Sequence, residues 1–209
     1  MHDNTLILNA DYSPLRVVGW TVGIELLYDR KATLVEQSPG RWVRSPSVVY
    51  PWPSVVVLRR YSHTKGRLKF SGRSLMARDL YRCCYCGVAP KLADGKPNLR
   101  GLSIDHVIPK SQARNYEVYA TWLRRWVPQT CWLNCVTACR QCNTRKANNR
   151  PDQAGMQLRI LPHEPTRDDT ARMAIARVRN IPGEWVSYLP PHWLGPLGLS
   201  TVQSAVQEQ

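Results

Sequence analysis

The sequence predicts an α+β fold whose central module is held together by a metal site. Three observations support this: two matched Cys-x-x-Cys pairs, short β-branched runs that alternate with helical patterns, and a rise in proline after residue 150. β-branched runs favour strands, and matched cysteine pairs are typical of structural metal sites. We expect a small, basic α/β region at 1–78, the module at 79–150, and a Pro-rich, partly helical extension at 151–209.

The N-terminal region combines strand and helix patterns. A helix is expected from Thr21 to Ala32, with Thr21 as its N-cap and Gly23 weakening it. Runs of apolar and β-branched residues predict four strands, at 5–9, 33–36, 47–50 and 54–58.

Beyond these strands, the remaining segments are expected to be loops and short helices. The basic segment 59–73 suits either a solvated loop or a loop that follows phosphates, and 74–81 suits a short helix leading to the first cysteines. In the extension, acids at the start and arginines near the end predict a helix over 167–179. The last residues, 200–209, are expected to form a frayed tail.

The charge of the chain is strongly positive and unevenly distributed. The net charge of +14 divides into +7 for 1–78, +8 for 79–150 and −1 for 151–209. A basic surface raises the local concentration of polyanions, so this balance favours nucleic acid as a partner. A solvated basic face of a soluble protein would give the same count.

Composition argues against a membrane protein. No apolar stretch reaches the 18 or so residues of a membrane span. The first residues also lack the basic-then-apolar order of a signal peptide. We therefore expect a cytoplasmic protein, in a bacterial or phage-infected cell, whose seven cysteines are reduced and available to metal.

The two cysteine pairs are the strongest signal in the sequence. Cys83 and Cys86 form one pair, and Cys139 and Cys142 form the other. A two-residue spacer lets both sulfurs of a pair reach one metal, so the two pairs supply the four thiolates of a structural Zn²⁺ site. The intervening 52 residues, 87–138, exceed the span of a simple zinc ribbon. The metal is therefore expected to join the two ends of a functional insert.

Three further cysteines fall outside this pattern. Cys131 and Cys135 are four residues apart and suit one face of a helix, with apolar packing as the simplest role. Cys84 also suits apolar packing, and using it as a zinc ligand would break the matched spacing.

Inside the insert lies a strand pattern with a polar pair, LSIDHVIP at 102–109. Adjacent residues of a strand point to opposite faces, so Asp105 and His106 can serve one site only if the strand ends or bends there. Pro109 is consistent with such an end. An Asp-His pair taken alone is more often structural.

Three segments together resemble the zinc-containing HNH endonucleases over roughly residues 79–150. They are the cysteine segment that starts at Tyr81, the run Ile-Asp-His-Val-Ile-Pro-Lys-Ser that starts at Ile104, and Asn-Cys-Val-Thr-Ala-Cys-Arg-x-Cys-Asn-x-x-Lys, which starts at Asn134. The opening LILNADYSPLRVVGW is similar to the leader of free-standing bacterial and phage HNH proteins.

The resemblance implies a ββα-metal fold that hydrolyses DNA phosphodiester bonds. It implies that His106 is the general base and that Asn134 bonds backbone across the loop and helps to orient it. It also implies that Asp105 and Asn143 hold the catalytic divalent ion, with Asn143 standing where many relatives carry His. Two oxygen ligands suit a hard ion, so Mg²⁺ or Mn²⁺ is expected in this Asp-His/Asn/Asn variant.

The basic residues of the module are candidate DNA contacts. Lys110 lies in the family motif, and Arg145 and Lys146 lie on the expected helix, where a solvated face is an equally good interpretation. Arg124 and Arg125 lie in 112–130, a segment that separates the Ser from the Asn further than in relatives.

The segment 112–130 has two interpretations. Its aromatic residues recur near helical spacing, which favours a helix packed on the module. The alternative is an aromatic and arginine surface for a flipped or splayed base, or for a partner.

Three functions fit these observations. The first is a DNA endonuclease that nicks or cuts a duplex. The second is a zinc-dependent nucleic-acid-binding module without catalysis. The third is an interaction protein of a phage or mobile-element DNA-processing complex, with a partner or dimer contact through 112–130 or the C-terminal extension. The set Asp105, His106 and Asn143 favours the first, because binding alone does not require it.

Overall fold

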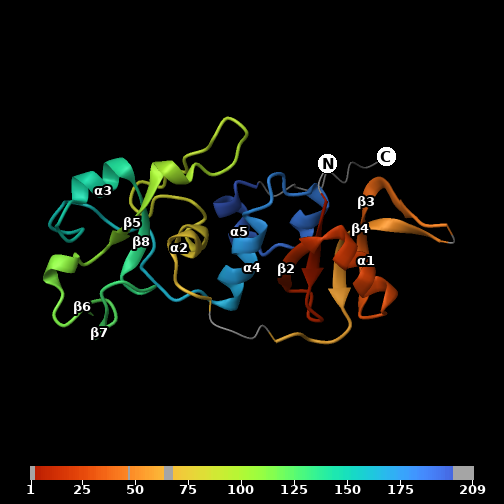
Figure 1. The fold of residues 1–209 in the computed structure, drawn as a ribbon, viewed down its shortest axis with the longest axis horizontal. Coiled ribbons are helices and arrows are strands. Elements are labelled where there is room, and N and C mark those ends of the chain that lie inside the picture. The colour runs from red at the N-terminus through yellow and green to blue at the C-terminus, as the bar shows by residue number, and fades with distance from the viewer. Residues whose placement is uncertain (1–2, 47, 64–67, 200–209) are drawn as a thin grey trace, which may run out of the picture. The chain divides into compact units, whose positions relative to one another are not determined.

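The computed structural model describes residues 3–46, 48–63 and 68–199. Residues 64–67 of the basic segment and the tail 200–209 lie outside the described residues. The described chain has a mixed α+β fold, as predicted (Figure 1). Among the helices it describes, none is long and apolar enough to cross a membrane.

The chain divides into two compact units. Unit 1 comprises Met1–Lys65 together with Thr170–Gln209, and unit 2 comprises Gly66–Asp169. The division therefore falls elsewhere than the expected boundaries after 78 and 150. The reason is that much of the C-terminal segment packs on the N-terminal sheet instead of standing apart as an extension.

Unit 1 is built on a four-stranded sheet with the order β2-β1-β4-β3. Its central strands β1 and β4 run parallel, whereas β1 and β2, and β3 and β4, pair antiparallel. The strands are β1 (Asn4–Leu8), β2 (Pro14–Gly19), β3 (Ala32–Arg44) and β4 (Val49–Leu58).

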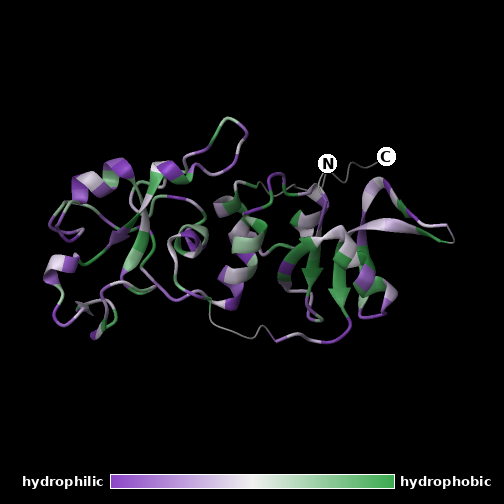
Figure 2. Cartoon of the chain, in the orientation of Figure 1, coloured by the Kyte–Doolittle hydropathy of each residue, from purple (hydrophilic) through white to green (hydrophobic). Residues whose placement is uncertain are grey.

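One face of this sheet is covered by the C-terminal segment. It presents Leu6 and Val55, among others, to the buried side chains of Trp185 and Trp193. The covering elements are α4 (Arg167–Ile175), the 3-10 helix η3 (Gly183–Tyr188) and α5 (Pro191–Leu197). Figure 2 shows the apolar residues gathered in these strands and in the elements that cover them.

The opposite face of the sheet is covered by α1 (Trp20–Tyr28), which packs through Leu26 and Leu27 on Ile7 and Val56. The helix begins one residue before Thr21, which does not cap it: Gly19 is the N-cap and supplies no side-chain bond. A Cβ added at Gly23 would lie 2.9 Å from Oγ1 of Thr5. Close packing against the sheet therefore explains this glycine.

Residues 49–50 of one predicted strand and the predicted strand 54–58 form a single long strand, β4, that continues through Pro51 and Pro53, while residue 47 lies outside the described residues. Only Val55 to Val57 pair with β1, so both prolines lie where β4 has β3 as its single neighbour in the sheet. A strand with one neighbour tolerates residues that lack an N–H donor.

Unit 2 is built around an antiparallel pair of strands, β5 (Leu102–His106) and β8 (Cys135–Cys139). Helix α2 (Gly72–Arg78) packs through Leu75 on Ile104 and Cys135. Helix α3 (Arg140–Lys146) bonds to Ser103 and Asp105, which alternate with Ile104 along β5. Because alternate residues of a strand face opposite sides, the two helices cover opposite faces of the pair.

The helix expected in 112–130 is wrong: the segment forms a β-hairpin. Its strands are β6 (Glu117–Ala120) and β7 (Arg125–Pro128), which pair antiparallel. Val118 and Val127 face each other and are buried, whereas Tyr119 and Trp126 face each other and are exposed. The buried apolar residues that anchor the hairpin thus alternate along its strands, with a period of two. Most of the aromatic residues whose spacing suggested a helix are exposed to solvent.

Helix α4 begins where predicted but ends at Ile175, four residues before 179. Its start is fixed by a reciprocal cap: Oδ2 of Asp169 accepts from the N–H of Thr166 at 2.9 Å, and Oγ1 of Thr166 accepts from the N–H of Asp169 at 3.1 Å. This arrangement satisfies two donors that the helix cannot satisfy itself.

A buried arginine joins several segments of unit 2. The guanidinium of Arg78 donates to the carbonyls of Trp132, Cys135 and His163, at 2.9–3.0 Å. It also pairs with Asp79 at 2.8 Å, and that carboxylate accepts the N–H of Thr137 at 2.7 Å. One ion pair therefore connects α2 to β8 and to the segment before α4.

We expect Arg78→Met to lower the free energy of unfolding by about 3–5 kcal/mol, because it leaves the buried Asp79 without its cation. Urea denaturation followed by circular dichroism measures the change. The matched control is Arg100→Met, which removes an exposed arginine and should change stability by less than about 0.5 kcal/mol. Equal urea midpoints for the two variants would contradict this role of Arg78.

Candidate metal centre and active site

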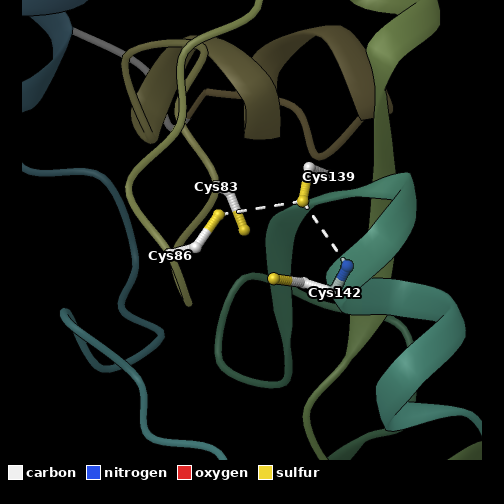
Figure 3. A group of neighbouring side chains, drawn as sticks. All are labelled: Cys83, Cys86, Cys139 and Cys142. Carbon is white, nitrogen blue, oxygen red and sulfur yellow. Dashed lines mark hydrogen bonds between the residues drawn. The ribbon is translucent and has the colours of Figure 1, made fainter.

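The two cysteine pairs come together at the junction of β8 and α3 (Figure 3). Their four sulfur atoms lie within 4.8 Å of one another. The pair Cys83 and Cys86 sits in a tight turn, closed by a bond of 2.9 Å from the N–H of Gly87 to the carbonyl of Cys83. Gly87 has a φ of +81°, a conformation that favours glycine. Cys139 ends β8, and Cys142 lies in α3.

This sulfur cluster fits a tetrahedral metal ion. Ligands at about 2.3 Å from a zinc ion lie about 3.8 Å from each other, and the sulfurs of Cys86 and Cys139 are 3.8 Å apart. Burial opposes ionisation of Cys83, but hydrogen bonds from the backbone of Cys139, Cys86 and Tyr85 lower its pKa to about 7. Burial and the neighbouring sulfurs raise the pKa of Cys142. A cation among the sulfurs would relieve that penalty, so the four cysteines can hold a metal ion such as zinc.

The other three cysteines pack as apolar residues, as expected. Cys84 is buried beside Tyr85 and Val136, and burial raises the pKa of its thiol. Cys131 and Cys135 do not share a helix: a single turn separates them, with the N–H of Cys135 bonded to the carbonyl of Cys131 at 3.0 Å. Each then packs in a different apolar cluster.

Helix α3 reaches β5 through two polar side chains, one turn apart. Nδ2 of Asn143 donates to Oγ of Ser103 at 2.9 Å. Nζ of Lys146 donates to Oδ1 of Asp105 at 2.9 Å and to the carbonyl of His106 at 2.8 Å. The structure therefore places Asp105 and Asn143, the two expected ion ligands, on the same face of β5.

Asp105 is buried, and both of its carboxylate oxygens have partners. Oδ1 accepts from Lys146, and Oδ2 accepts a bond of 2.5 Å from the hydroxyl of Tyr85. The exposed fraction is 4% for Asp105 and 1% for Lys146. Burial and the Asp105 charge raise the pKa of Tyr85, which keeps it a donor. Tyr85 lies between two cysteines, and nothing in the sequence signalled this role.

The structure corrects the expectation for Lys146. It is neither a DNA contact nor part of a solvated helix face, because its ammonium is enclosed between β5 and α3. The physical reason is the buried charge of Asp105, which needs a cation within hydrogen-bond distance. Arg145, the adjacent residue, is exposed and donates to the carbonyl of Gly155 at 3.3 Å.

His106 ends β5, and its side chain points to the face opposite Asp105, where it lies beside Cys135 of β8. Its Nε2 is 2.9 Å from Oγ1 of Thr130. Partial burial and the positive charges of Lys110 and Lys146 lower the pKa of His106, against an opposing effect of Asp105. The imidazole is therefore neutral at physiological pH and able to accept a proton.

Asn134 is buried and bonds to backbone on both sides of the segment that separates β5 from β8. Its side chain pairs twice with Ile108, accepting from the N–H at 3.0 Å and donating to the carbonyl at 3.1 Å. It also donates to the carbonyl of Gln129 at 2.7 Å. Since Ile108 and Gln129 are near neighbours of His106 and Thr130 in the chain, these bonds restrain both partners of the imidazole contact.

The remaining basic candidates are exposed on the same unit. Lys110 lies four residues after His106, and Arg124 and Arg125 lie at the turn of the β6–β7 hairpin. Exposure leaves all three available to a phosphate, which the buried Lys146 is not.

Comparison with known proteins gives one family match. The model of the HNH endonuclease-associated N-terminal domain matches residues 5–66. This match associates the chain with HNH endonucleases. The matched segment comprises the four strands and α1 of unit 1, so it lies outside the part that holds the cysteines, Asp105 and His106. No curated protein and no solved structure matched the chain.

We expect the purified protein to contain one metal ion per chain and Cys139→Ala to lose it, because three sulfurs bind such an ion far more weakly than four. Metal content is measured by mass spectrometry and by release to a chromogenic chelator. Cys131→Ala is the matched control, since Cys131 lies outside the sulfur cluster. Retention of metal by Cys139→Ala would disprove this assignment of the ligands.

Proposed function

We propose that this protein is a metal-dependent HNH endonuclease that hydrolyses DNA phosphodiester bonds, by nicking or by double-strand cleavage. In this proposal β5, β8 and α3 are the ββα-metal module, and DNA, most simply a duplex, is the substrate. The observation that carries it is the placement of His106. Its neutral imidazole lies at the end of β5 and is oriented by Thr130. The segment that follows it is restrained by Asn134. The HNH-associated match of residues 5–66 supports the same conclusion independently.

His106 acts as the general base. Nε2 of His106 is 2.9 Å from Oγ1 of Thr130. The proposal assigns the tautomer in which Nε2–H donates to this oxygen, so that Nδ1 receives the proton. A water molecule attacks the phosphorus and passes its proton to Nδ1. The new O–P bond forms as the bond from phosphorus to the leaving oxygen breaks. Thr130 and Asn134 act as positioning residues, because they fix the ring and its loop.

Zinc at the four cysteines has a structural role in this proposal. It joins the turn that contains Cys83 and Cys86 to the junction of β8 and α3. That junction carries Asn143 and Lys146, and the turn carries Tyr85. The zinc site would therefore hold together the segments that surround Asp105.

Asp105 and Asn143 are the proposed ligands of the catalytic ion, Mg²⁺ or Mn²⁺. A hard ion bound there would stabilise charge on the phosphate oxygens. Their present contacts fit this role only in part, since Asp105 is buried and bonded to Lys146 and Tyr85. Asp105 and His106 also point to opposite faces of β5, so one phosphate could contact both only at the end of the strand, where His106 lies. An ion held by Asp105 and Asn143 would take over the charge compensation that the Lys146 ammonium gives to Asp105.

We expect His106→Ala to reduce cleavage of supercoiled plasmid in Mg²⁺ or Mn²⁺ by at least about 100-fold, the contribution of a general base. Gel electrophoresis of the open-circular and linear products measures the rate. His192→Ala, which removes an exposed histidine outside unit 2, should cleave like the wild type. Both variants should keep the metal of the four cysteines. Cleavage by His106→Ala at the wild-type rate would refute the mechanism.

We expect Lys146→Met to be less stable than the wild type by about 3–5 kcal/mol when no divalent ion is added, because it leaves Asp105 buried without a cation. Millimolar Mg²⁺ should then raise the melting temperature of this variant more than that of the wild type, since the ion replaces the lost charge. Lys110→Met, which removes an exposed lysine, is the matched control. Equal Mg²⁺ shifts in all three proteins would show that the ion does not bind at Asp105.

One observation favours a second candidate, a zinc-dependent nucleic-acid-binding module without catalysis. Both oxygens of Asp105 are engaged, which is the arrangement expected of a carboxylate with a purely structural role. The same plasmid assay separates the two functions. Salt-dependent DNA binding without cleavage in any divalent ion would establish the second candidate.

A further inference from the structure

The β6–β7 hairpin has a buried, apolar inner face and an exposed, aromatic outer face. Its inner face places Val118, Ala120 and Val127 in a cluster with Ile108, close to His106 in the chain. This packing fixes the hairpin on the module. Whatever its outer face binds is therefore held at a defined position relative to the imidazole.

The outer face carries large aromatic side chains in water. The exposed fraction is 42% for Tyr119 and 47% for Trp126, and Tyr116, in the turn before β6, is 81% exposed. Tyr119 and Trp126 lie opposite each other on β6 and β7, with ring centroids 5.7 Å apart and planes inclined at 66°. Exposed aromatic clusters of this kind mark binding surfaces.

Short contacts connect the base of the hairpin to the imidazole. The N–H of Gln129 bonds to the carbonyl of Tyr116 at 2.8 Å, and the next residue, Thr130, bonds to His106. The base of the hairpin is thus one residue from the hydroxyl that orients the ring.

The charge around the hairpin indicates the chemistry of its ligand. Residues 110–130 contain four basic side chains and a single acid, Glu117. Arg124 is exposed at the turn, and Arg125 is exposed at the start of β7, opposite Ala120 of the inner face. No salt bridge forms to either arginine among the described residues. Aromatic rings bordered by arginines complement a polyanion whose bases are free to stack. Paired bases in a duplex do not offer such faces, and an apolar protein surface would leave the arginines unmatched.

We propose that the outer face of the β6–β7 hairpin, formed by Tyr119 and Trp126 and bordered by Arg124 at its turn, binds unpaired nucleotides of the DNA next to the phosphate at His106. This inference rests on the proposed function and narrows its substrate to DNA with a single-stranded or splayed segment. Tyr119 and Trp126 stack on the bases, and Arg124 contacts the backbone.

The test measures binding without cleavage. Fluorescence anisotropy follows a fluorescein-labelled mixed-sequence oligonucleotide, single-stranded or annealed to its complement, with full-length His106→Ala protein and no added divalent ion. Introducing Trp126→Ala or Tyr119→Ala should weaken single-strand binding by about 5- to 100-fold, the effect of losing one stacked base. Duplex binding should change little.

Two variants serve as controls on the same hairpin. Trp126→Phe keeps an aromatic ring and should retain most of the single-strand affinity. Glu117→Gln alters the same outer face without touching a ring and should bind at least as well as the parent protein. Melting temperatures show that each variant is folded, which is expected because all three positions are exposed.

Two outcomes overturn the proposal. In one, Trp126→Ala and Tyr119→Ala bind the single strand like the parent, which would leave a protein partner as the occupant of this face. In the other, single-strand and duplex binding fall equally. The proposed function fails separately, if wild-type protein does not cleave although its hairpin variants lose single-strand binding.

Discussion

The buried carboxylate of Asp105 is the constraint around which unit 2 is organised. An anion away from water needs a cation and hydrogen-bond donors, and here each comes from a different segment. Lys146 comes from α3, and Tyr85 comes from the turn that holds the first cysteine pair. The segments that meet at the sulfur cluster therefore meet a second time at Asp105. Each of the two sites limits the ways in which the other can be arranged, and together they hold α3 against β5.

Because side chains alternate along β5, its two faces carry different functional groups. The face toward α3 carries the charge compensation of Asp105, while the opposite face presents His106 beside Thr130. Lys146 connects the two faces. Its ammonium also bonds to the carbonyl of His106, and its positive charge helps to keep the imidazole of His106 neutral. The β6–β7 hairpin lies between β5 and β8 in the chain and carries exposed aromatic side chains. Asn134 restrains the end of this hairpin as well as the segment that follows His106.

Much of this architecture could be predicted from local signals. The spacing of the cysteines identified the four residues that cluster, because that spacing reflects ligand geometry directly. The β-branched runs located β1, β4 and part of β3, but they missed β2. The hairpin at 112–130 was missed because exposed aromatic residues imitated a helical period, while its anchor consists of only a few small apolar side chains. The role of Tyr85 and the burial of Lys146 depend on contacts 20 and 41 residues away in the chain, which no local pattern contains.

Unit 1 is interrupted in the sequence by unit 2, and this has a consequence for how the protein is made. Leu6, Leu8 and Val55 leave the ribosome long before Trp185 and Trp193, the residues that cover them. Unit 2 is contiguous and can close as soon as it has emerged. Until the C-terminal segment is made, one apolar face of the N-terminal sheet is uncovered. This sheet is therefore the part of the nascent chain most in need of protection by a chaperone. Unit 2 can therefore complete its fold before unit 1, although unit 1 begins first in the sequence.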